Sequence, residues 1–580
     1  MIHRSKSFNE ISLKKGFTMV TETLKSVDEL IRKGRGDLAI KLLQDILTQK
    51  DLTSDQRTRV LSKLGEALLL FGLSKEGEEI LKPLIFSKQT YHNIEKKVYF
   101  LEAIHELIDL WFYLMDIENL EKYKEFLIEF SKKNDSEIIK GLQFEIEAIL
   151  NNLKGKFNKA LNNYLRAKTI FEKHSLNYIA ACILEKASRI DILTNQNSIA
   201  YELIEEVFSL LPEDVALFRR SRFLSTKALI EIKNGKQKEA CSDLKQAFYY
   251  ISRGFGNSQS YVDVYCVAAE YALVRGKAYQ AQVYLELALG EIQGIKSIIQ
   301  HIYLLNLQLA VYYELRKLEE SLELFFKHEK YLSQIIAYPF FVTQIIVYTS
   351  LAAVELGKFE VLEQIKQSIE NKIFKDSFSS FIEPLISAME AYSKNNWQVA
   401  EKNLLQVIQM VNDFRMFNLK LVAYYYLGQL YLKMALHNND YKKAENALRV
   451  AENMEEIVNL TGYSQYRLKG LLIKALALVV LERQEEASLI FESLGSEIEN
   501  SELVTDIQLY HEYIALAREE ESKEYTEEDT YFFIIKNLIE TGASDEELIE
   551  VITSTIPDEI VEHIKERVLK EFPEAKKFFE

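Results

Sequence analysis

Apolar residues recur at three- and four-residue spacings along most of the chain, a pattern that predicts amphipathic helices. In the stretch LKGKFNKALNNYLRAKTIF, Gly155 precedes Ala160, Tyr164 and Ala167 by five, nine and twelve residues. A glycine between two helical patterns is typical of a turn, so the stretch predicts the end of one helix, a turn and a second helix. The same order recurs in NGKQKEACSDLKQAF at 234–248 and RGKAYQAQVYLELAL at 275–289.

A marker residue can be assigned to each repeat, namely the residue that follows the turn by about five positions and is usually small. The markers are Ala39, Gly77, Tyr123, Ala160, Ala200, Ala240, Ala281, Ser321, Leu362, Ala400, Ala444 and Ala487. They run from position 39 to position 487 with a mean spacing of about 41 residues, within the range typical of solenoids. The spacing predicts about twelve helix-turn-helix repeats.

A second small residue precedes most markers by twelve positions and falls on the preceding helix. These residues are Gly65, Ala148, Ser188, Ala228, Ala269, Ser350, Ala388 and Ala475, with Gly428 in the same role before a longer turn. Two small residues that face each other allow antiparallel helices to approach closely. We therefore expect each repeat to be a tight helical hairpin that packs against the next.

Composition supports helices throughout the chain. Only 20 glycines and 6 prolines interrupt 580 residues, and 48% of the residues are hydrophobic. No stretch approaches the 18 or more uninterrupted apolar residues of a membrane span, so we expect no membrane insertion. The fold class predicted is all-α.

The residues quoted above resemble the tetratricopeptide repeat (TPR), and YYYLGQLY at 424–431 adds Leu427, Gly428 and Tyr431 in that family's order. A period near 41 instead of 34 is similar to the long-helix variants in maltose-activator-type regulators and Pins-like scaffolds. HEAT and armadillo repeats share this period but lack the doubled small residue. The resemblance implies a right-handed α-solenoid, a TPR-like superhelix whose first helices line a concave surface that binds a protein or peptide.

Four segments are expected along the chain. Residues 1–20 form a leader, with Met19 as an alternative start, and residues 21–500 form the repeat array. A capping helix and an acidic linker follow at 501–524, because terminal repeats need a polar cover. Residues 525–580 are expected to form a small C-terminal helical segment, either packed on the array or acting as a separate partner-binding appendage.

The net charge and the cysteine content restrict the classes of partner and the cellular location. The net charge of −16 repels phosphate backbones, so we expect no direct nucleic-acid binding. Three cysteines at positions that favour small residues predict free thiols, in keeping with a cytoplasmic location.

Motifs that carry chemistry are absent from the sequence. It contains no phosphate-binding loop, no paired zinc-ligand motif and no nucleophile elbow, and its nine histidines are scattered singly. We therefore expect no enzyme activity, no catalytic residues, no metal site and no cofactor.

Candidate partner-binding residues are those that the resemblance places on first helices. The later repeats contribute Asn306, Tyr313, Gln344, Tyr348, Met389, Tyr392, Tyr425 and Gln429, and the middle repeats contribute Arg189 and Arg222. Tyrosine at a binding surface provides apolar area together with a hydroxyl. The competing interpretations are a solvated charged face for the arginines and helix core for the aromatic residues.

The function expected is that of a scaffold or regulatory interaction module that binds a protein or peptide partner. The first alternative is a sensor of a ligand or peptide that controls a separately encoded effector. The second is an enzyme with an unrecognised helical active site.

Overall fold

The computed structural model describes residues 22–517 except positions 32, 34, 50–51, 92, 194–196, 212–216, 294–296, 333–338, 373–380, 414–416, 439 and 499–502. It also describes residues 558–579 and separate positions between 531 and 556. The expected leader at 1–20 and the expected linker at 518–524 lie outside the described residues, as does most of 525–557.

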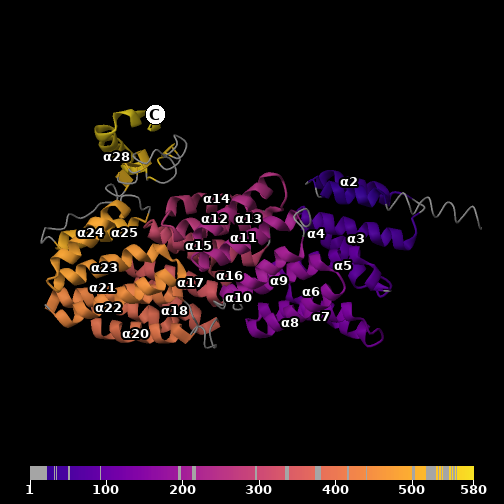
Figure 1. Cartoon of the computed structure of the whole chain (residues 1–580), viewed down its shortest axis with the longest axis horizontal. Helices are drawn as coiled ribbons and strands as arrows, with labels where there is room; N and C mark the ends of the chain where they lie inside the picture. Colours follow the sequence, from indigo (N-terminus) through magenta and orange to yellow (C-terminus); the bar gives the residue numbers. More distant parts are fainter. Residues whose placement is uncertain are drawn as a thin grey trace, which may run out of the picture. The chain divides into compact units, whose positions relative to one another are not determined.

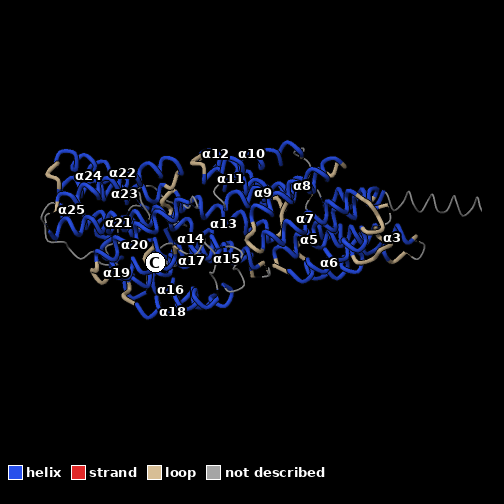
Figure 2. The backbone as a smooth tube through the Cα atoms, turned by 90° about the horizontal axis from the view of Figure 1, so that it is seen from below, coloured by secondary structure: helices blue, strands red, loops and turns tan. Residues whose placement is uncertain are grey.

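All regular secondary structure in this part of the chain is helical, which confirms the all-α class (Figure 2). A first helix covers residues 22–31. The next helices are α2 (Gly36–Leu47), α3 (Ser54–Leu70), α4 (Ser74–Ile85), α5 (Val98–Tyr113), α6 (Ile117–Ser131), α7 (Glu137–Leu153), α8 (Phe157–Lys173), α9 (Asn177–Leu193), α10 (Asn197–Leu210), α11 (Leu217–Lys233), α12 (Gln237–Ser252), α13 (Ser258–Val274) and α14 (Ala278–Ile292). They are followed by α15 (Ile298–Glu314), α16 (Leu318–Leu332), α17 (Pro339–Glu355), α18 (Phe359–Lys372), α19 (Ile382–Ser393), α20 (Trp397–Asp413), α21 (Phe417–Asn438), α22 (Tyr441–Thr461), α23 (Arg467–Val480), α24 (Gln484–Ile498), α25 (Val504–Ala517) and α28 (Asp558–Glu571). Short 3₁₀ helices are η1 (Ile94–Lys96), η2 (Ser464–Tyr466) and η3 (Pro573–Phe578).

Helices pack against their neighbours in chain order, as expected for a helical tandem repeat (Figure 1). Contacts join each helix to the next from α7 to α12 and again from α19 to α24. Odd-numbered helices from α3 to α23 are the first helices of their repeats, and even-numbered helices are the second. No helix in the described part of the chain is long and apolar enough to cross a bilayer.

The chain divides into two compact units. Unit 1 comprises Met1–Ala268, Glu286–Leu304 and Ile335–Phe340. Unit 2 comprises Ala269–Leu285, Leu305–Gln334 and Phe341–Glu580. Each unit is described below by itself.

The turns between first and second helices share one hydrogen-bond pattern. At Gly155 the backbone has φ 68°, and the Lys156 N–H donates to the Asn151 carbonyl at 2.8 Å. This is the Schellman arrangement, in which a left-handed residue ends the helix, and glycine adopts that conformation at the least cost. Glycines at the ends of first helices are expected to be left-handed, and this is confirmed at Gly72, Gly155, Gly235, Gly276 and Gly357. Gly34, expected in the same role, lies outside the described residues.

The third repeat differs in register from the marker assigned to it. Its turn residue is Met115, with φ 53°, and the Asp116 N–H donates to the Trp111 carbonyl at 2.8 Å. The residue five positions after this turn is Leu120, which is buried, and not Tyr123. The sequence has neither a glycine at this turn nor a small residue five positions later, so the pattern placed the marker three residues too late.

Small residues meet where the two helices of a repeat cross. A Cβ built on Gly77 would lie 3.1 Å from the Gly65 carbonyl oxygen and 2.6 Å from a Leu69 methyl carbon. These distances leave no room for a side chain, so the close approach that the small residues predict is present between α3 and α4. Ala148 and Ala160 are fully buried on α7 and α8, which also pack together.

Ala160→Leu is expected to destabilise the protein by about 1–3 kcal/mol, because a larger side chain overpacks the α7–α8 contact. Thermal melts followed by circular dichroism measure this loss. Asn162→Leu, at an exposed position on the same helix, is the control and should change stability by no more than about 0.5 kcal/mol. Equal effects of the two substitutions would contradict the register proposed for this repeat.

Candidate functional site

The first helices of the repeats in unit 1 carry a network of buried charged side chains, called here the ion network. Its carboxylates are Glu106, Asp109, Glu145, Glu185 and Asp263, and its cationic side chains are His105, Lys186, Arg189, Arg219 and Arg222. All of them lie on first helices, namely α5, α7, α9, α11 and α13. The inner faces of these helices therefore meet one another through ion pairs.

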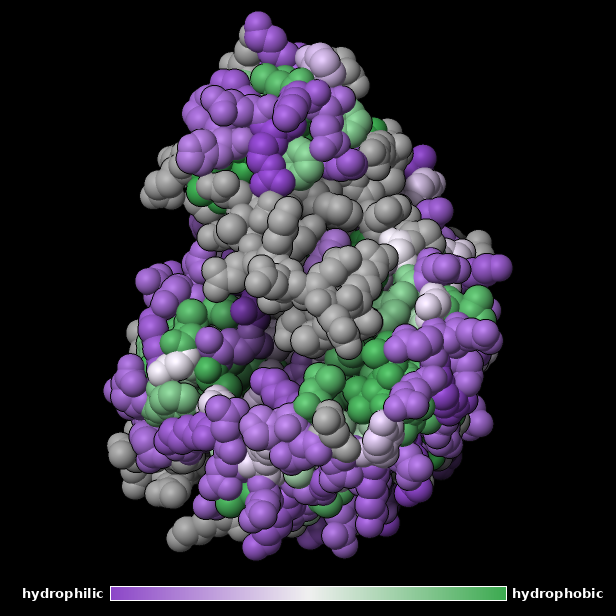
Figure 3. Space-filling view, turned by 90° about the vertical axis from the view of Figure 1, so that its left-hand side faces the viewer, coloured by the Kyte–Doolittle hydropathy of each residue, from purple (hydrophilic) through white to green (hydrophobic). Residues whose placement is uncertain are grey.

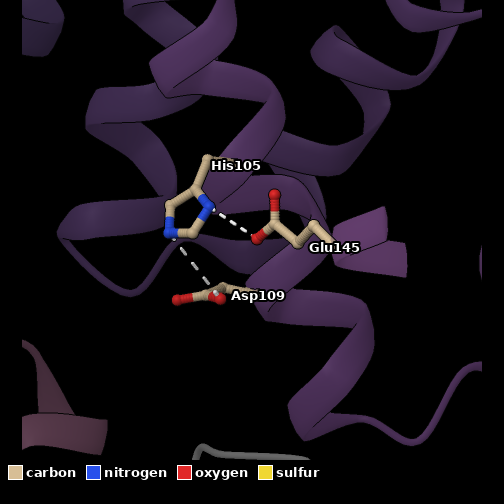
Figure 4. A group of neighbouring side chains, drawn as sticks. All are labelled: His105, Asp109 and Glu145. Atoms are coloured by element: carbon tan, nitrogen blue, oxygen red, sulfur yellow. Dashed lines mark ion pairs between the residues drawn. The ribbon is translucent and has the colours of Figure 1, made fainter. Parts of the chain in front are cut away.

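His105 lies at the start of the ion network, between two carboxylates (Figure 4). Its Nδ1 is 2.8 Å from Glu145 Oε1, and its Nε2 is 4.0 Å from Asp109 Oδ1. The Lys186 ammonium pairs with Asp109 and lies 3.1 Å from Glu145 Oε1. One lysine on α9 thus binds carboxylates from both α5 and α7.

Arginines of α9 and α11 extend the ion network over the first helices of four repeats. Arg219 pairs with Glu106 on α5 and lies 2.9 Å from Asp109 Oδ2. Arg222 donates to Glu185 Oε2 at 2.8 Å, and its guanidinium lies 4.8 Å from the centre of the Tyr113 ring. Arg189 pairs with Glu185 and lies 3.1 Å from Asp263 Oδ2. The helices α5, α9, α11 and α13 are joined by these contacts.

The ionisation of the network follows from burial and pairing together. Burial alone lowers the pKa of His105, but the nearby carboxylates, Glu145 more than Asp109, raise that pKa overall to about 10. Burial raises the pKa of Asp109, yet Lys186 and His105 hold it well below its usual range. The pKa of Glu185 is lowered to about 2, since Arg189 and Arg222 outweigh its burial. His105, Asp109 and Glu185 are therefore ionised at neutral pH.

His105, Asp109 and Glu145 present ligand atoms that all lie within 4.8 Å of one another, a spacing that could hold a metal ion. The Lys186 ammonium, however, already pairs with both carboxylates. A divalent cation would be repelled by this ammonium and would have to displace the proton that His105 holds. We interpret the three residues as part of the ion network and not as a metal centre.

Unit 1 is expected to lose stability as the pH rises from about 6.5 to about 10. The folded pKa of His105, about 10, lies above its ordinary value of 6.5. The stabilisation is therefore complete below pH 6.5 and is lost as the pH rises through the folded pKa. Urea unfolding followed by Trp111 fluorescence reports on unit 1 once Trp397, the second of two tryptophans, is replaced by phenylalanine.

His105→Gln is the matched variant for this pH dependence. It should be less stable than the parent at pH 6 and should lose less stability than the parent between pH 6.5 and 10. A pH slope unchanged by this substitution would show that His105 does not hold its proton in the folded state.

The inner helices of unit 2 contain a smaller buried ion cluster. Lys469 Nζ on α23 lies 3.0 Å from Glu314 Oε2 on α15 and 2.8 Å from Asp506 Oδ1 on α25. Burial raises the pKa of Asp506 to about 6 even though Lys469 lowers it. These ion pairs connect α25 to α15 and α23.

Next to this cluster, unit 2 contains a pocket of about 340 Å³, called here the tyrosine pocket. First helices α15, α17, α19, α21 and α23 line it together with α25. Its lining comprises Tyr313, Arg316, Val354, Glu355, Tyr392, Ser393, Tyr425, Tyr426, Gln429, Leu432, Lys433, Leu436, Leu476, Gln508, Leu509 and Tyr513. The volume is at the lower end of the range for small-molecule sites.

Hydrogen bonds connect the polar groups of the tyrosine pocket. The Tyr313 hydroxyl donates to Glu355 Oε1 at 2.6 Å, and Glu355 also pairs with Arg316. The Tyr392 hydroxyl donates to Gln429 Oε1 at 3.3 Å, and Gln429 Nε2 donates to the Tyr425 hydroxyl oxygen at 2.8 Å. These bonds orient the tyrosine rings that form the pocket walls.

The predicted partner-binding residues divide into three groups. Tyr313, Tyr392, Tyr425 and Gln429 line the tyrosine pocket together. Asn306, Gln344, Tyr348 and Met389 are buried in unit 2 and are not part of its lining; Asn306 Nδ2 donates to Gln344 Oε1 at 2.8 Å. Arg189 and Arg222 belong to the ion network, so their guanidinium groups are already engaged inside unit 1.

Several pocket residues were not identified from the sequence. Lys433 follows Gln429 by four residues on α21, so the same helical spacing could have found it. Arg316 lies in a turn, and Gln508, Leu509 and Tyr513 lie on α25, which was expected only to cover the last repeat. No sequence signal connects those positions to the tyrosines.

The surface around this end of unit 2 is mixed in character. Figure 3 shows patches of apolar residues (green) among a predominantly hydrophilic surface (purple). At the pocket, Leu436 is 41% exposed although it is a large apolar residue. An exposed leucine next to a pocket provides apolar area for a partner.

Comparison with known proteins gives no family. No family model matches the chain, and no curated protein matches it. Among solved structures, the chain is similar to a circular tandem repeat protein with novel repeat topology and enhanced subunit contact surfaces, with 11% sequence identity over 90% of this chain and 91% of that chain. The TM-score of 0.13 is too low to support an argument, so the assignment as a helical tandem-repeat protein rests on the helices and contacts described above.

Proposed function

We propose that this chain is a TPR-type scaffold that binds a protein or peptide partner at the tyrosine pocket of unit 2. The observation that carries the proposal is the convergence of six inner helices on one pocket lined by tyrosines, amides and both signs of charge. Aromatic side chains with a hydroxyl are enriched where protein partners bind most tightly. The repeat period, the paired small residues and the left-handed turns support the TPR assignment.

The ion network of unit 1 supports different roles for the two units. Its charged side chains are engaged with one another, and leaving any of them unpaired would cost free energy. A partner therefore gains little by binding the inner face of unit 1. We propose that the inner face of unit 1 is structural and that binding belongs to unit 2.

Tyr392→Ala is expected to weaken partner binding by about 1–2 kcal/mol, because an anchoring aromatic ring commonly contributes this much. Tyr392 is only partly buried, so the unit should stay folded. Partners are captured by pull-down, identified by mass spectrometry and then titrated against purified protein. Tyr441→Ala, at a tyrosine that is 51% exposed outside the pocket, is the control. Equal affinities of the two variants would contradict the proposal.

A ligand- or peptide-sensing regulator of a separate effector is the second candidate. The observation that favours it is the contribution of α25 to the pocket, through Gln508, Leu509 and Tyr513. A ligand that touches this last helix of the array could alter how firmly the helix is held. Hydrogen exchange of α25 that is the same with and without the captured partner would argue against the sensor.

We propose a binding function and not a catalytic one, because the titratable groups of the pocket lining are phenols, two cations and one carboxylate that is already paired. A cytoplasmic location remains part of the proposal, supported by three cysteines that form no disulfide, Cys182, Cys241 and Cys266.

A further inference from the structure

One carboxylate on α5 lacks the cation that its neighbours on the helix have. Glu106 and Asp109 both pair with Arg219. Glu102 lies one turn before Glu106, on the same side of α5, and makes no hydrogen bond or ion pair with another described residue. A partly buried carboxylate without a partner costs free energy, which a bound cation would recover.

The ionisation of Glu102 reflects this lack of a partner. Burial raises its pKa above the ordinary value, and the carboxylates of Asp28 and Glu106 add to the rise. Lys63 and His105 lower that pKa but do not cancel the rise. The charged groups around Glu102 therefore leave its charge incompletely compensated.

The two cations near Glu102 are bound to other carboxylates. The Lys63 ammonium lies 2.9 Å from Asp28 Oδ1 and 3.1 Å from Glu66 Oε1. His105 belongs to the ion network described above. A cation that pairs with Glu102 directly would have to come from a ligand.

Glu102 lines a pocket of about 220 Å³, called here the Glu102 pocket, between the start of α5, the turn into α9 and the end of α10. Most of its other walls are aliphatic, namely Val98, Leu176, Ile179, Leu210 and Leu211. The volume is smaller than that of a usual site for a drug-sized ligand, so the pocket suits one side chain or one short aliphatic chain.

Tyr178 adds an aromatic wall to the Glu102 pocket. Its hydroxyl donates to Glu106 Oε1 at 2.6 Å, which holds the ring in place. Donation to a carboxylate increases the electron density of the ring, and an electron-rich ring attracts a cation.

The acceptors of the pocket suit an ammonium better than a guanidinium or a metal ion. An ammonium has three N–H donors and a guanidinium has five. Glu102 offers two oxygens, and the exposed side chains of Ser175 and Asn177 can accept a further hydrogen bond. A guanidinium would leave donors against aliphatic walls, and a divalent metal ion needs more oxygen ligands than one carboxylate supplies.

We propose that the Glu102 pocket binds a primary ammonium carried on an aliphatic chain, with the ammonium against the Glu102 carboxylate and the chain against the aliphatic walls. The ammonium could belong to a lysine side chain of a peptide or to a free alkylamine, and the experiment separates these sources. The site is additional to the partner site proposed for unit 2 and does not depend on it.

Ligand-observed NMR titration of the full chain tests the proposal with two matched pairs of probes. N-acetyl-leucyl-lysyl-leucine amide is compared with its Nε-acetyl-lysine counterpart, and pentylamine is compared with pentan-1-ol. At least one amine is expected to bind about tenfold more tightly than its neutral counterpart, because its charge meets a carboxylate partly shielded from water. The amine that does so identifies the source, and replacing its ammonium by a guanidinium should weaken binding.

Two substitutions on α5 connect this preference to the pocket. Glu102→Gln should remove the preference for the amine while leaving the affinity for the neutral counterpart unchanged. Val98 is 45% exposed and lies four residues before Glu102, so Val98→Lys should place a tethered ammonium at the carboxylate. This variant should bind the free amine about tenfold more weakly, since a tethered competitor acts at a high effective concentration. Glu125→Gln, at an exposed carboxylate on α6, is the control.

Equal binding of each amine and its neutral counterpart would overturn the proposal, as would a preference for the amine that persists in Glu102→Gln. A guanidinium that binds more tightly than the ammonium would overturn the choice of ligand class. None of these outcomes bears on the tyrosine pocket, which the Tyr392→Ala variant tests separately.

Discussion

Lys186→Met is expected to destabilise unit 1 by about 3–5 kcal/mol, the usual cost of removing one partner from a buried ion pair. Lys186 is fully enclosed and pairs with Asp109 and Glu145. Methionine has a similar length, so the packing changes little while two buried carboxylates lose their shared cation. Urea unfolding followed by Trp111 fluorescence, in the Trp397→Phe background, measures the loss.

Lys154→Met is the matched control for this prediction. Its ammonium also pairs with a carboxylate, Glu121 at 2.9 Å, but both side chains are about half exposed. Exposed pairs of this kind contribute about 0–1 kcal/mol. Comparable losses in Lys154→Met and Lys186→Met would mean that the ion network does not hold unit 1 together.

Lys469→Met is expected to destabilise unit 2 by about 3–5 kcal/mol for the same reason, with the loss concentrated at α25. The substitution leaves Glu314 and Asp506 buried without their shared cation. Hydrogen exchange of peptides from α15, α23 and α25 should speed up in the variant. Lys474→Met, on the same helix in a more exposed pair with Glu455, should leave this exchange nearly unchanged.

The loss of stability caused by Lys469→Met should also depend on pH. The pKa of Asp506 is raised to about 6 even with Lys469 present. Without the lysine the carboxyl takes up a proton more readily, and a neutral carboxyl costs less to bury. The loss of stability relative to the parent should therefore be smaller at pH 5 than at pH 8. A loss of stability that grows as the pH falls would contradict this explanation.

Much of the repeat could be predicted from the sequence because its signals are local. The small residue after the turn lies about five residues from the glycine that ends many of the first helices. The small residue is constrained by the close helix crossing, and the glycine by its left-handed backbone conformation. The third repeat was misplaced because Met115 replaces the turn glycine and Leu120, five residues later, is not a small residue. Where a non-glycine turn is still followed by a small residue, as at Asn395 and Ala400, the remaining local signal placed the repeat correctly.

The sequence did not predict which faces of the first helices are buried and which line a pocket. Arg219 on α11 pairs with Glu106 on α5, 113 residues earlier in the chain, and no local pattern records that contact. Whether inner faces meet or leave a pocket depends on how successive repeats rotate. The position three residues before the small residue of the first helix therefore holds a buried ion pair at Glu185 and a pocket wall at Tyr425.

The central claim is that partners bind the tyrosine pocket of unit 2, and site-specific photo-crosslinking tests it most directly. A photoreactive phenylalanine replaces Leu436, which is 41% exposed at the pocket, or Leu165, which is 38% exposed on α8 of unit 1. The account predicts that the captured partner cross-links from position 436 and not from position 165, and that Tyr392→Ala removes the cross-link. Cross-linking from position 165 with none from position 436 would contradict it.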